Sequence, residues 1–224
     1  MTLNPSIKKV ITPAAEGAIA SYDYFDIASG TGIKNFYACQ SYASGATTHT
    51  GFLTTDASIQ SDPIAEKVNG GSGLLTSKNY DVAFNLPQII NGDIKITVSQ
   101  GTYCSQADEQ HAYVTMRLYK VSGGTPVQLG DEVTTLTTLG ATGISSEQKV
   151  VIITVPKTTF KKDDILRLTV EGRGKAVSAG NKATGYGCDP ASRDDILTAS
   201  GAALITAGET TQLKVGVPFV VDVS

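Results

Sequence analysis

The sequence predicts an all-β protein, an antiparallel β-sandwich of the jelly-roll type with eight to ten strands and long loops. In residues 149–156 valine and isoleucine follow one another, and in residues 163–172 apolar and polar residues alternate with the period of two that is typical of a strand. Composition agrees, because charged residues make up 17% of the chain, against about 25% in an average protein, and glycine occurs 23 times. No segment shows the period of a helix of three turns.

One domain with an N-terminal arm accounts for the length of 224 residues. Residues 1–18 contain two prolines and no sustained period, so we expect an extended arm. Its apolar residues Ile7, Val10 and Ile11 are candidate contacts with another protein chain. Residues 19–224 are expected to form a single β-sandwich domain.

Aromatic residues dominate the first predicted hairpin. Its strands are residues 19–27 and 33–43, and the small residues 28–32 form the turn between them. Residues 44–73 are rich in glycine, serine and threonine, which predicts a long loop with one short edge strand.

Two half-buried strands are predicted in the next part of the chain. Residues 80–86 and 94–98 both alternate between apolar and polar side chains. The dipeptide Asn91-Gly92 lies between them and is typical of a tight turn, so we expect it to join the two strands.

Residues 111–121 form the next predicted strand, with Tyr113 and Tyr119 on its outer face. Two tyrosines on one face can stack on a sugar, but contact with another layer or subunit is the favoured interpretation. The turn at residues 122–125 leads to a threonine-rich strand at residues 127–139.

The consecutive β-branched residues 150–153 indicate a strand covered on both faces, by the core on one side and by another layer or subunit on the other. Val150 and Ile152 are therefore candidate interface residues. Pro156 is expected to end this strand, because proline cannot donate a ladder hydrogen bond. The strand in residues 163–172 is expected to have one face in contact with water.

Two contrasting segments complete the chain. Residues 172–208 are rich in glycine and lack a sustained period, so we expect them to be mostly connection, serving as functional surface or packing on a neighbouring molecule. Residues 211–223 alternate clearly and predict a final structural strand.

Charge and apolar pattern argue against two classes of partner. A net charge of −3 leaves no basic footprint for nucleic acid. No apolar run is long enough to span a bilayer and the N-terminus has no signal-peptide pattern, so a soluble protein made in the cytoplasm is expected, with no membrane partner.

Motifs for catalysis, cofactors and zinc are missing from the sequence. It contains no serine-hydrolase elbow, no P-loop and no dinucleotide fingerprint. Cys39, Cys104 and Cys188 are far apart, and only His49 and His111 are available as histidine ligands or bases. We therefore expect no cofactor and no enzyme activity.

An acidic cluster at Asp189, Asp194 and Asp195 is a candidate calcium loop, because carboxylates of one loop can converge on a hard cation. Its spacing is not that of an EF-hand. Solvated turn acids with Arg193 as a local partner are the favoured interpretation, so no metal is expected.

Three stretches resemble the β-rich virion proteins of tailed bacteriophages. They are MTLNPSIKKV at residues 1–10, GYGCDPASRDD at residues 185–195 and TQLKVGVPFVVDV at residues 211–223. The resemblance implies a jelly-roll subunit on the particle, either a capsid decoration (cement) protein or a head or tail fibre component. The major capsid protein or another virion protein would be its partner, and the virion its location after synthesis in the host cytoplasm.

Three functional hypotheses remain open at this point. The first is a non-enzymatic virion subunit that stabilises the particle by protein contacts. The second is a receptor- or carbohydrate-binding module of a fibre, and the third is a hydrolase that uses a carboxylate pair. Because the predicted strands carry more apolar surface than one sandwich hides, we expect a homo-oligomer, with a trimer favoured.

Overall fold

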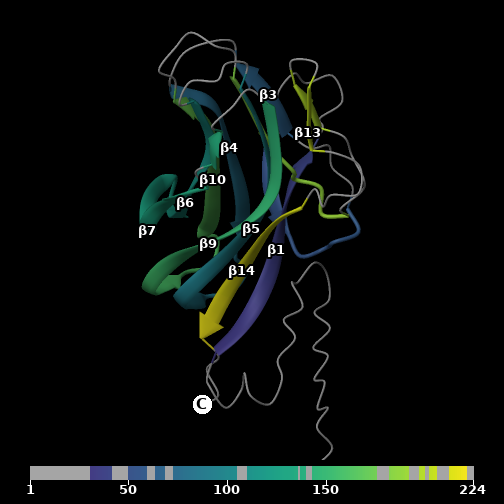
Figure 1. Ribbon diagram of the computed structural model, residues 1–224. Helices are drawn as coiled ribbons and strands as arrows, with labels where there is room; N and C mark the ends of the chain where they lie inside the picture. Colours follow the sequence, from purple (N-terminus) through teal and green to yellow (C-terminus); the bar gives the residue numbers. More distant parts are fainter. Residues whose placement is uncertain are drawn as a thin grey trace, which may run out of the picture.

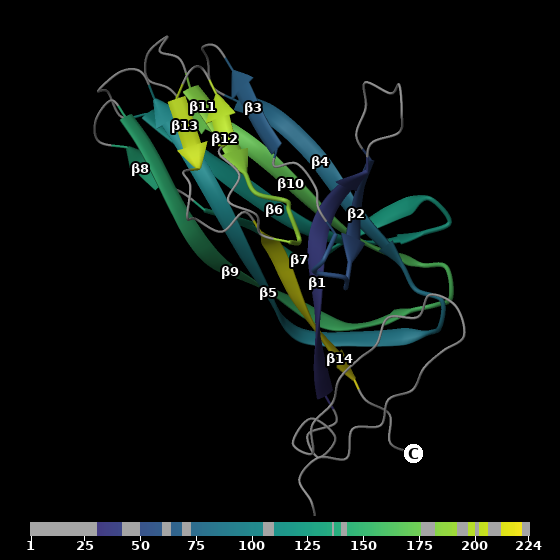
Figure 2. The same ribbon diagram turned by 90° about the vertical axis from the view of Figure 1, so that its right-hand side faces the viewer.

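The computed structural model is an all-β fold in which a single large sheet curls on itself (Figure 1, Figure 2). The structure describes residues 31–41, 50–59, 64–68, 73–104, 110–135, 137–139, 143–175, 182–191, 197–199, 202–205 and 212–220. The N-terminal arm with Ile7, Val10 and Ile11, and the first strand of the predicted hairpin, lie outside the described residues.

Fourteen strands are present in the described residues, and these residues contain no helix. They are β1 (Thr31–Ser41), β2 (Thr50–Thr54), β3 (Ile64–Val68), β4 (Gly73–Ala83), β5 (Gln88–Cys104), β6 (Gln110–Ser122), β7 (Thr125–Thr134), β8 (Thr137–Leu139), β9 (Gly143–Phe160), β10 (Ile165–Lys175), β11 (Lys182–Tyr186), β12 (Leu197–Ala199), β13 (Ala202–Ile205) and β14 (Leu213–Val220). No helix long and apolar enough to cross a membrane occurs among these residues.

The strand order of the large sheet is β3-β11-β5-β14-β1-β2-β4-β10-β6-β7, with β9 paired to β5 and β8 paired to β6. All neighbours are antiparallel except β2 and β4, which run parallel. The prediction of an all-β, sandwich-like fold is confirmed. The strands are more numerous than the expected eight to ten, because glycine-rich segments contribute several short ones.

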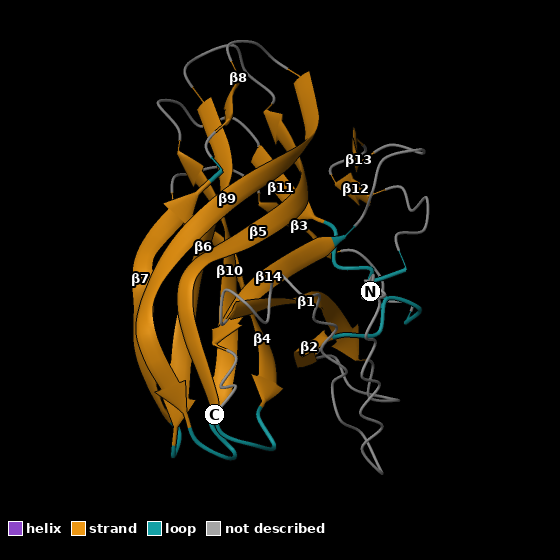
Figure 3. Ribbon diagram, turned by 90° about the horizontal axis from the view of Figure 1, so that it is seen from below, coloured by secondary structure: helices purple, strands orange, loops and turns teal. Residues whose placement is uncertain are grey.

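The curl brings β7 close to β9, as Figure 3 shows from below. Gly130 of β7 makes this approach feasible, since a Cβ atom there would lie 2.5 Å from the carbonyl oxygen of Thr154 and 2.8 Å from the side chain of Ile153. Its φ of 68° also favours glycine. Nearby, the ammonium group of Lys120 in β6 donates to the carbonyl of Thr159 in β9 at 2.6 Å.

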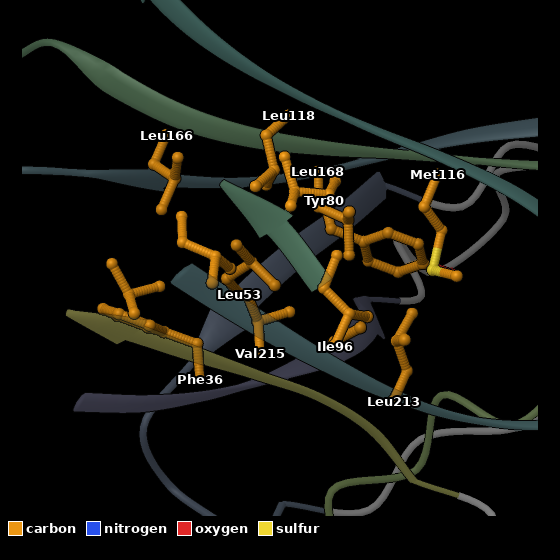
Figure 4. Packing of buried hydrophobic residues seen from close by; sticks show 14 of the residues in the cluster. Phe36, Leu53, Tyr80, Ile96, Met116, Leu118, Leu166, Leu168, Leu213 and Val215 are labelled. Carbon is orange, nitrogen blue, oxygen red and sulfur yellow. The ribbon is translucent and has the colours of Figure 1, made fainter. Parts of the chain in front are cut away.

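A continuous apolar core lies between the two sides of the curl (Figure 4). Because side chains alternate along a strand, every second residue of β5, β6, β10 and β14 points inward. At one end of the core, Phe84 stacks edge to face on Phe160 and Phe219, with ring centroids 5.0 and 5.8 Å apart. Such aromatic pairs add specific contact energy to area burial.

Two sequence predictions about strand ends are wrong, and one bulge explains both. Gly92 does not form a turn: β5 runs through it with a φ of 108°, and the chain reverses at residues 84–87 instead. Pro156 does not end β9, which continues to Phe160. The register of β5 and β9 shifts between the pairs Gly92–Val155 and Ile90–Thr158, and an irregular ladder tolerates both a positive φ and a missing N–H.

Two segments expected to be loops contain paired strands. Residues 44–73 hold two strands, and β2 lies between β1 and β4 rather than at an edge. Residues 172–208 hold β11, which pairs with β3 and β5. Their strands are too short to show a long alternating pattern in the sequence, and pairing with distant strands stabilises them.

Candidate interaction surface

Four adjacent strands, β9, β5, β14 and β1, present one outer surface, which we call the β5 face. Cross-strand register defines it, because residues directly opposite each other in neighbouring strands point to the same side. Lys95 lies opposite both Ile152 and Gly216, and Gly216 lies opposite Asn35. The β5 face consists of Ile33, Asn35, Tyr37, Asp93, Lys95, Thr97, Val150, Ile152, Thr154, Lys214 and Gly216.

Apolar side chains stand exposed on the β5 face. Val150 and Ile33 are each 61% exposed and Ile152 is 47% exposed, whereas Ile153 and Val155 of the same β9 strand are buried. One face of this strand is therefore covered by the core, as predicted. On the outward side, no described residue covers these side chains, which keeps Val150 and Ile152 as interface candidates.

A shallow hollow of about 250 Å³ lies on this face above Gly216. It is lined by Ile33, Asn35, Asp93, Lys95, Thr97, Lys214 and Gly216. A Cβ atom at Gly216 would meet Asn35 Oδ1 at 3.4 Å, so the missing side chain is what opens the hollow.

The charges on the β5 face are only partly compensated. Asp93 accepts a hydrogen bond from the Thr154 hydroxyl at 2.7 Å. Within the described part of the chain neither Lys95 nor Lys214 makes an ion pair. Lys95 is exposed and Lys214 is half-buried. Such lysines beside exposed apolar side chains are suited to a partner that supplies both apolar area and carboxylates.

The opposite outer surface, on β4, β10, β6 and β7, differs because its charges are paired internally. Arg117 bridges Glu132 and Glu171, the latter at 2.8 Å, and Arg173 reaches Glu171 at 2.5 Å. Burial alone would raise the pKa of Glu171, but hydrogen bonds from Arg173 and Arg117 outweigh it and hold that pKa below its usual range. The expected wet face of β10 is thus partly buried, since Glu171 is only 8% exposed.

Tyr113 and Tyr119 lie on this second surface, on the outer side of β6 as predicted. Both are half-buried, and they lie opposite Arg173 and Arg167 in the β6–β10 ladder. They therefore do not share a face with Val150, and the interface candidates among the described residues fall on two separate surfaces.

The acidic loop differs from the expected set of solvated turn acids. Asp189 is fully buried, and its carboxylate accepts the backbone N–H of Ala191 at 3.2 Å. Asp194 and Asp195 lie outside the described residues. In the ranges that the structure describes, no three metal-ligating side chains come together.

A buried polar cluster near this loop was not predicted. The Tyr80 hydroxyl donates to the Tyr186 hydroxyl at 3.3 Å, and the Gln40 amide donates to Cys188 Sγ at 3.3 Å. Burial, together with Tyr186 and Cys188 nearby, raises the pKa of Tyr80 well above its usual value. Cys39 and Cys188 are buried free thiols.

The residues of the hollow were not predicted as site residues either. The alternation in residues 94–98 and 211–223 indicates that Lys95, Thr97 and Lys214 point outward. It contains no sign that they lie side by side, because β5 and β14 are neighbours only in the folded sheet.

No protein-family model and no curated protein matches the sequence. Among solved structures, the chain is similar to a CocE/NonD family hydrolase from Staphylococcus aureus, with 11% identity, a TM-score of 0.49, and coverage of 92% of this chain and 40% of that one. It is also similar to an aminopeptidase from a marine sediment Thaumarchaeota archaeon, with 6% identity, a TM-score of 0.42, and coverage of 83% and 37%. The Gx strain of infectious bursal disease virus gives 9% identity, a TM-score of 0.25, and coverage of 96% and 45%.

The expectation that the protein is not an enzyme is contradicted by the first two of these neighbours, which are named as a hydrolase and an aminopeptidase, and we do not retain it. The chain spans less than half the length of each of these proteins. Their names describe those proteins, and a likeness at this identity assigns no catalytic residue to this chain.

Proposed function

We propose that the protein is a structural subunit of a virion, a capsid decoration (cement) protein, and that it attaches to other protein chains through the β5 face. The observation that carries this proposal is the exposure of Val150, Ile152 and Ile33 on strands whose opposite side is packed core. The resemblance of the sequence to phage virion proteins supports the same role.

The physical basis is a rigid apolar surface. Because β9, β5 and β14 are held in a sheet above a packed core, binding orders few additional groups and loses little conformational entropy. Each apolar square ångström removed from water contributes about 25 cal/mol. Repetition at many identical sites adds these contributions to the stability of a particle.

A receptor- or carbohydrate-binding module of a head or tail fibre is the second candidate, and the hollow above Gly216 favours it. Asn35 and Asp93 line this hollow and can hydrogen-bond sugar hydroxyls. The test is binding to a glycan array by the wild type and by an Asn35→Ala variant. Binding by the wild type that the variant loses would favour this alternative over the capsid decoration protein.

The decisive experiment locates the chain on particles. Particles purified from cells that carry the gene are labelled with antibody to this chain and viewed by electron microscopy, for the wild type and for a Val150→Ser/Ile152→Ser variant. Val127→Ser is the matched control, because Val127 is 60% exposed but lies on β7, outside the β5 face. We expect label on wild-type and control particles and its loss with the double variant. Absence of the wild-type chain from particles, or equal labelling of all three, would contradict the proposal.

A further inference from the structure

Hydrogen-bond donors surround the hollow above Gly216. In the sheet, Gly216 of β14 lies between Asn35 of β1 and Lys95 of β5. In the next row, Lys214 lies opposite Thr97. Neighbouring strands are about 4.8 Å apart and alternate residues of one strand about 6.6 Å apart, so the four side chains enclose a space a few ångströms wide. The backbone of Gly216 forms its floor, because this residue has no side chain.

These donors have no partner of their own. In the part of the chain that the structure describes, the side chains of Lys95, Lys214, Asn35 and Thr97 make no hydrogen bond and no ion pair. Asn35 places Oδ1 towards Gly216, and since no hydrogen bond holds this amide, it can turn its N–H groups to the same side. A ligand with acceptor oxygens therefore finds donors that need break no existing contact.

The lining of the hollow is positive, although the whole chain has a net charge of −3. Two lysines and one aspartate line it, which leaves a charge of +1. The carboxylate of Asp93 is already engaged, because it accepts the Thr154 hydroxyl at 2.7 Å. One added carboxylate neutralises this lining, whereas a phosphate group, with a charge of about −1.5 to −2, exceeds it.

We infer that the hollow receives one carboxylate, that of an aspartate or glutamate side chain of the partner chain. This inference rests on the proposed function and names the chemistry that the β5 face recognises. Lys95 and Lys214 give charge-assisted hydrogen bonds to the carboxylate, and Asn35 gives a neutral one. Ile152 lies beside Lys95 in the same row, and Ile33 lines the hollow on the other side, both exposed. The complementary segment is therefore an acidic residue with apolar neighbours.

Charge changes in the lining test this site. Purified chain is added to particles from cells in which its gene is deleted, and its dissociation constant is measured by co-sedimentation. Lys95→Met and Lys214→Met keep an apolar side chain and remove the charge, so each should raise the dissociation constant about tenfold. Asp93→Asn keeps an acceptor for Thr154 and removes a competing negative charge, so it should lower the constant about threefold.

Two further variants separate a seated carboxylate from a general effect of charge. Lys162→Met removes an exposed charge in the turn between β9 and β10, outside the β5 face, and should leave the constant unchanged. Gly216→Ala adds a methyl group to the floor, 3.4 Å from Asn35 Oδ1, and should raise the constant about fivefold although no charge changes. Thermal unfolding of every variant checks that it is folded.

Cross-linking with a carbodiimide identifies the ligand group. The reagent activates the partner carboxylate, the amine of Lys95 or Lys214 attacks it, and an amide forms as the reagent leaves as a urea. Peptide mass spectrometry should show either lysine joined to an aspartate or glutamate of a particle protein. Wild-type binding by both Met variants, or cross-links that never include these lysines, would overturn the inference and leave attachment through the β5 face intact. A wild-type chain that does not bind the particles would contradict the proposed function as well.

Discussion

Lys120 and Asp164 lie 3.0 Å apart, ammonium nitrogen to carboxylate oxygen, and join β6 to the turn between β9 and β10. Asp164 also accepts the Ser122 hydroxyl at 2.6 Å and the Lys161 backbone N–H at 2.8 Å. The hydrogen bonds from Ser122 and Lys161, followed by the contacts with Lys120, lower the pKa of Asp164 from 3.8 to about 2. The carboxylate therefore stays ionised in the folded protein to a much lower pH than in the unfolded chain.

Stability should depend on pH through this group. Because the pKa of Asp164 is lower in the folded state, its contribution is fully present above about pH 4 and is lost as the pH falls from 4 towards 2. Urea unfolding at a series of pH values should show this loss in the wild type, and Asp164→Asn should reduce the slope in that range. Asp163→Asn, at an exposed neighbouring position, is the control. Equal slopes for Asp164→Asn and the wild type would refute the assignment.

Gly130→Ala should destabilise the fold by about 1–3 kcal/mol, because it adds both a strained φ and a contact with the Thr154 carbonyl. Gly124→Ala isolates the first effect, since Gly124 has a φ of 84° and open space around its Cβ position. Chemical denaturation of the two variants should therefore rank Gly130→Ala as clearly worse. The same loss in both would mean that the approach of β7 to β9 is not tight.

The core prediction concerns Leu168, which is fully buried between the two sides of the curl. Leu168→Ala should lower the free energy of unfolding by about 2–5 kcal/mol through lost burial and a residual cavity. Leu86→Ala should change it by less than about 0.5 kcal/mol, because Leu86 is 68% exposed. Calorimetry on both variants checks the contrast, and similar melting temperatures would count against this core.

Removal of Arg117 should cost more stability than removal of Arg167. Arg117 neutralises the buried Glu171, whereas Arg167 pairs at 2.7 Å with the half-buried Asp81. Loss of Arg117 leaves Glu171 paired with Arg173 but takes away one of its two cationic partners. A buried carboxylate that is less fully neutralised carries a larger desolvation penalty than one that water can reach. Urea denaturation of Arg117→Met and Arg167→Met should show this order. A combined Arg117→Met/Glu171→Gln variant should recover part of the loss, and an absence of recovery would place the effect elsewhere.

Which side of each long strand faces the core was predictable from the sequence. In β6, β10 and β14 the alternation identified Met116, Leu168 and Val215 as inward residues, and all three are buried. This worked because the period of two is a local property of an extended chain. Tyr113 and Tyr119 were placed outward for the same reason, whereas Val150 and Ile152 were interface candidates because a run of β-branched residues predicted a strand covered on both faces.

Local sequence preferences for turns predicted the structure less well where long-range contacts determined the conformation. Asn91-Gly92 has the composition of a hairpin turn, yet the β5–β9 ladder accommodates Gly92 as a bulge. Asp189 looked like a solvated acid, but it is buried. In both cases contacts with residues distant in sequence outweighed a local preference.

The sequence by itself determined the all-β class, the inward and outward sides of its strands and the outward position of Lys95 and Lys214, since each of these depends on residues close together in the chain. Only the tertiary structure decided that β5 lies between β14 and β9, and so assembled Ile33, Asp93, Lys95 and Ile152 into one face with a hollow over Gly216. Strand order is set by long-range pairing and by burial of the common core, and alternation within a single strand carries no information about its neighbour.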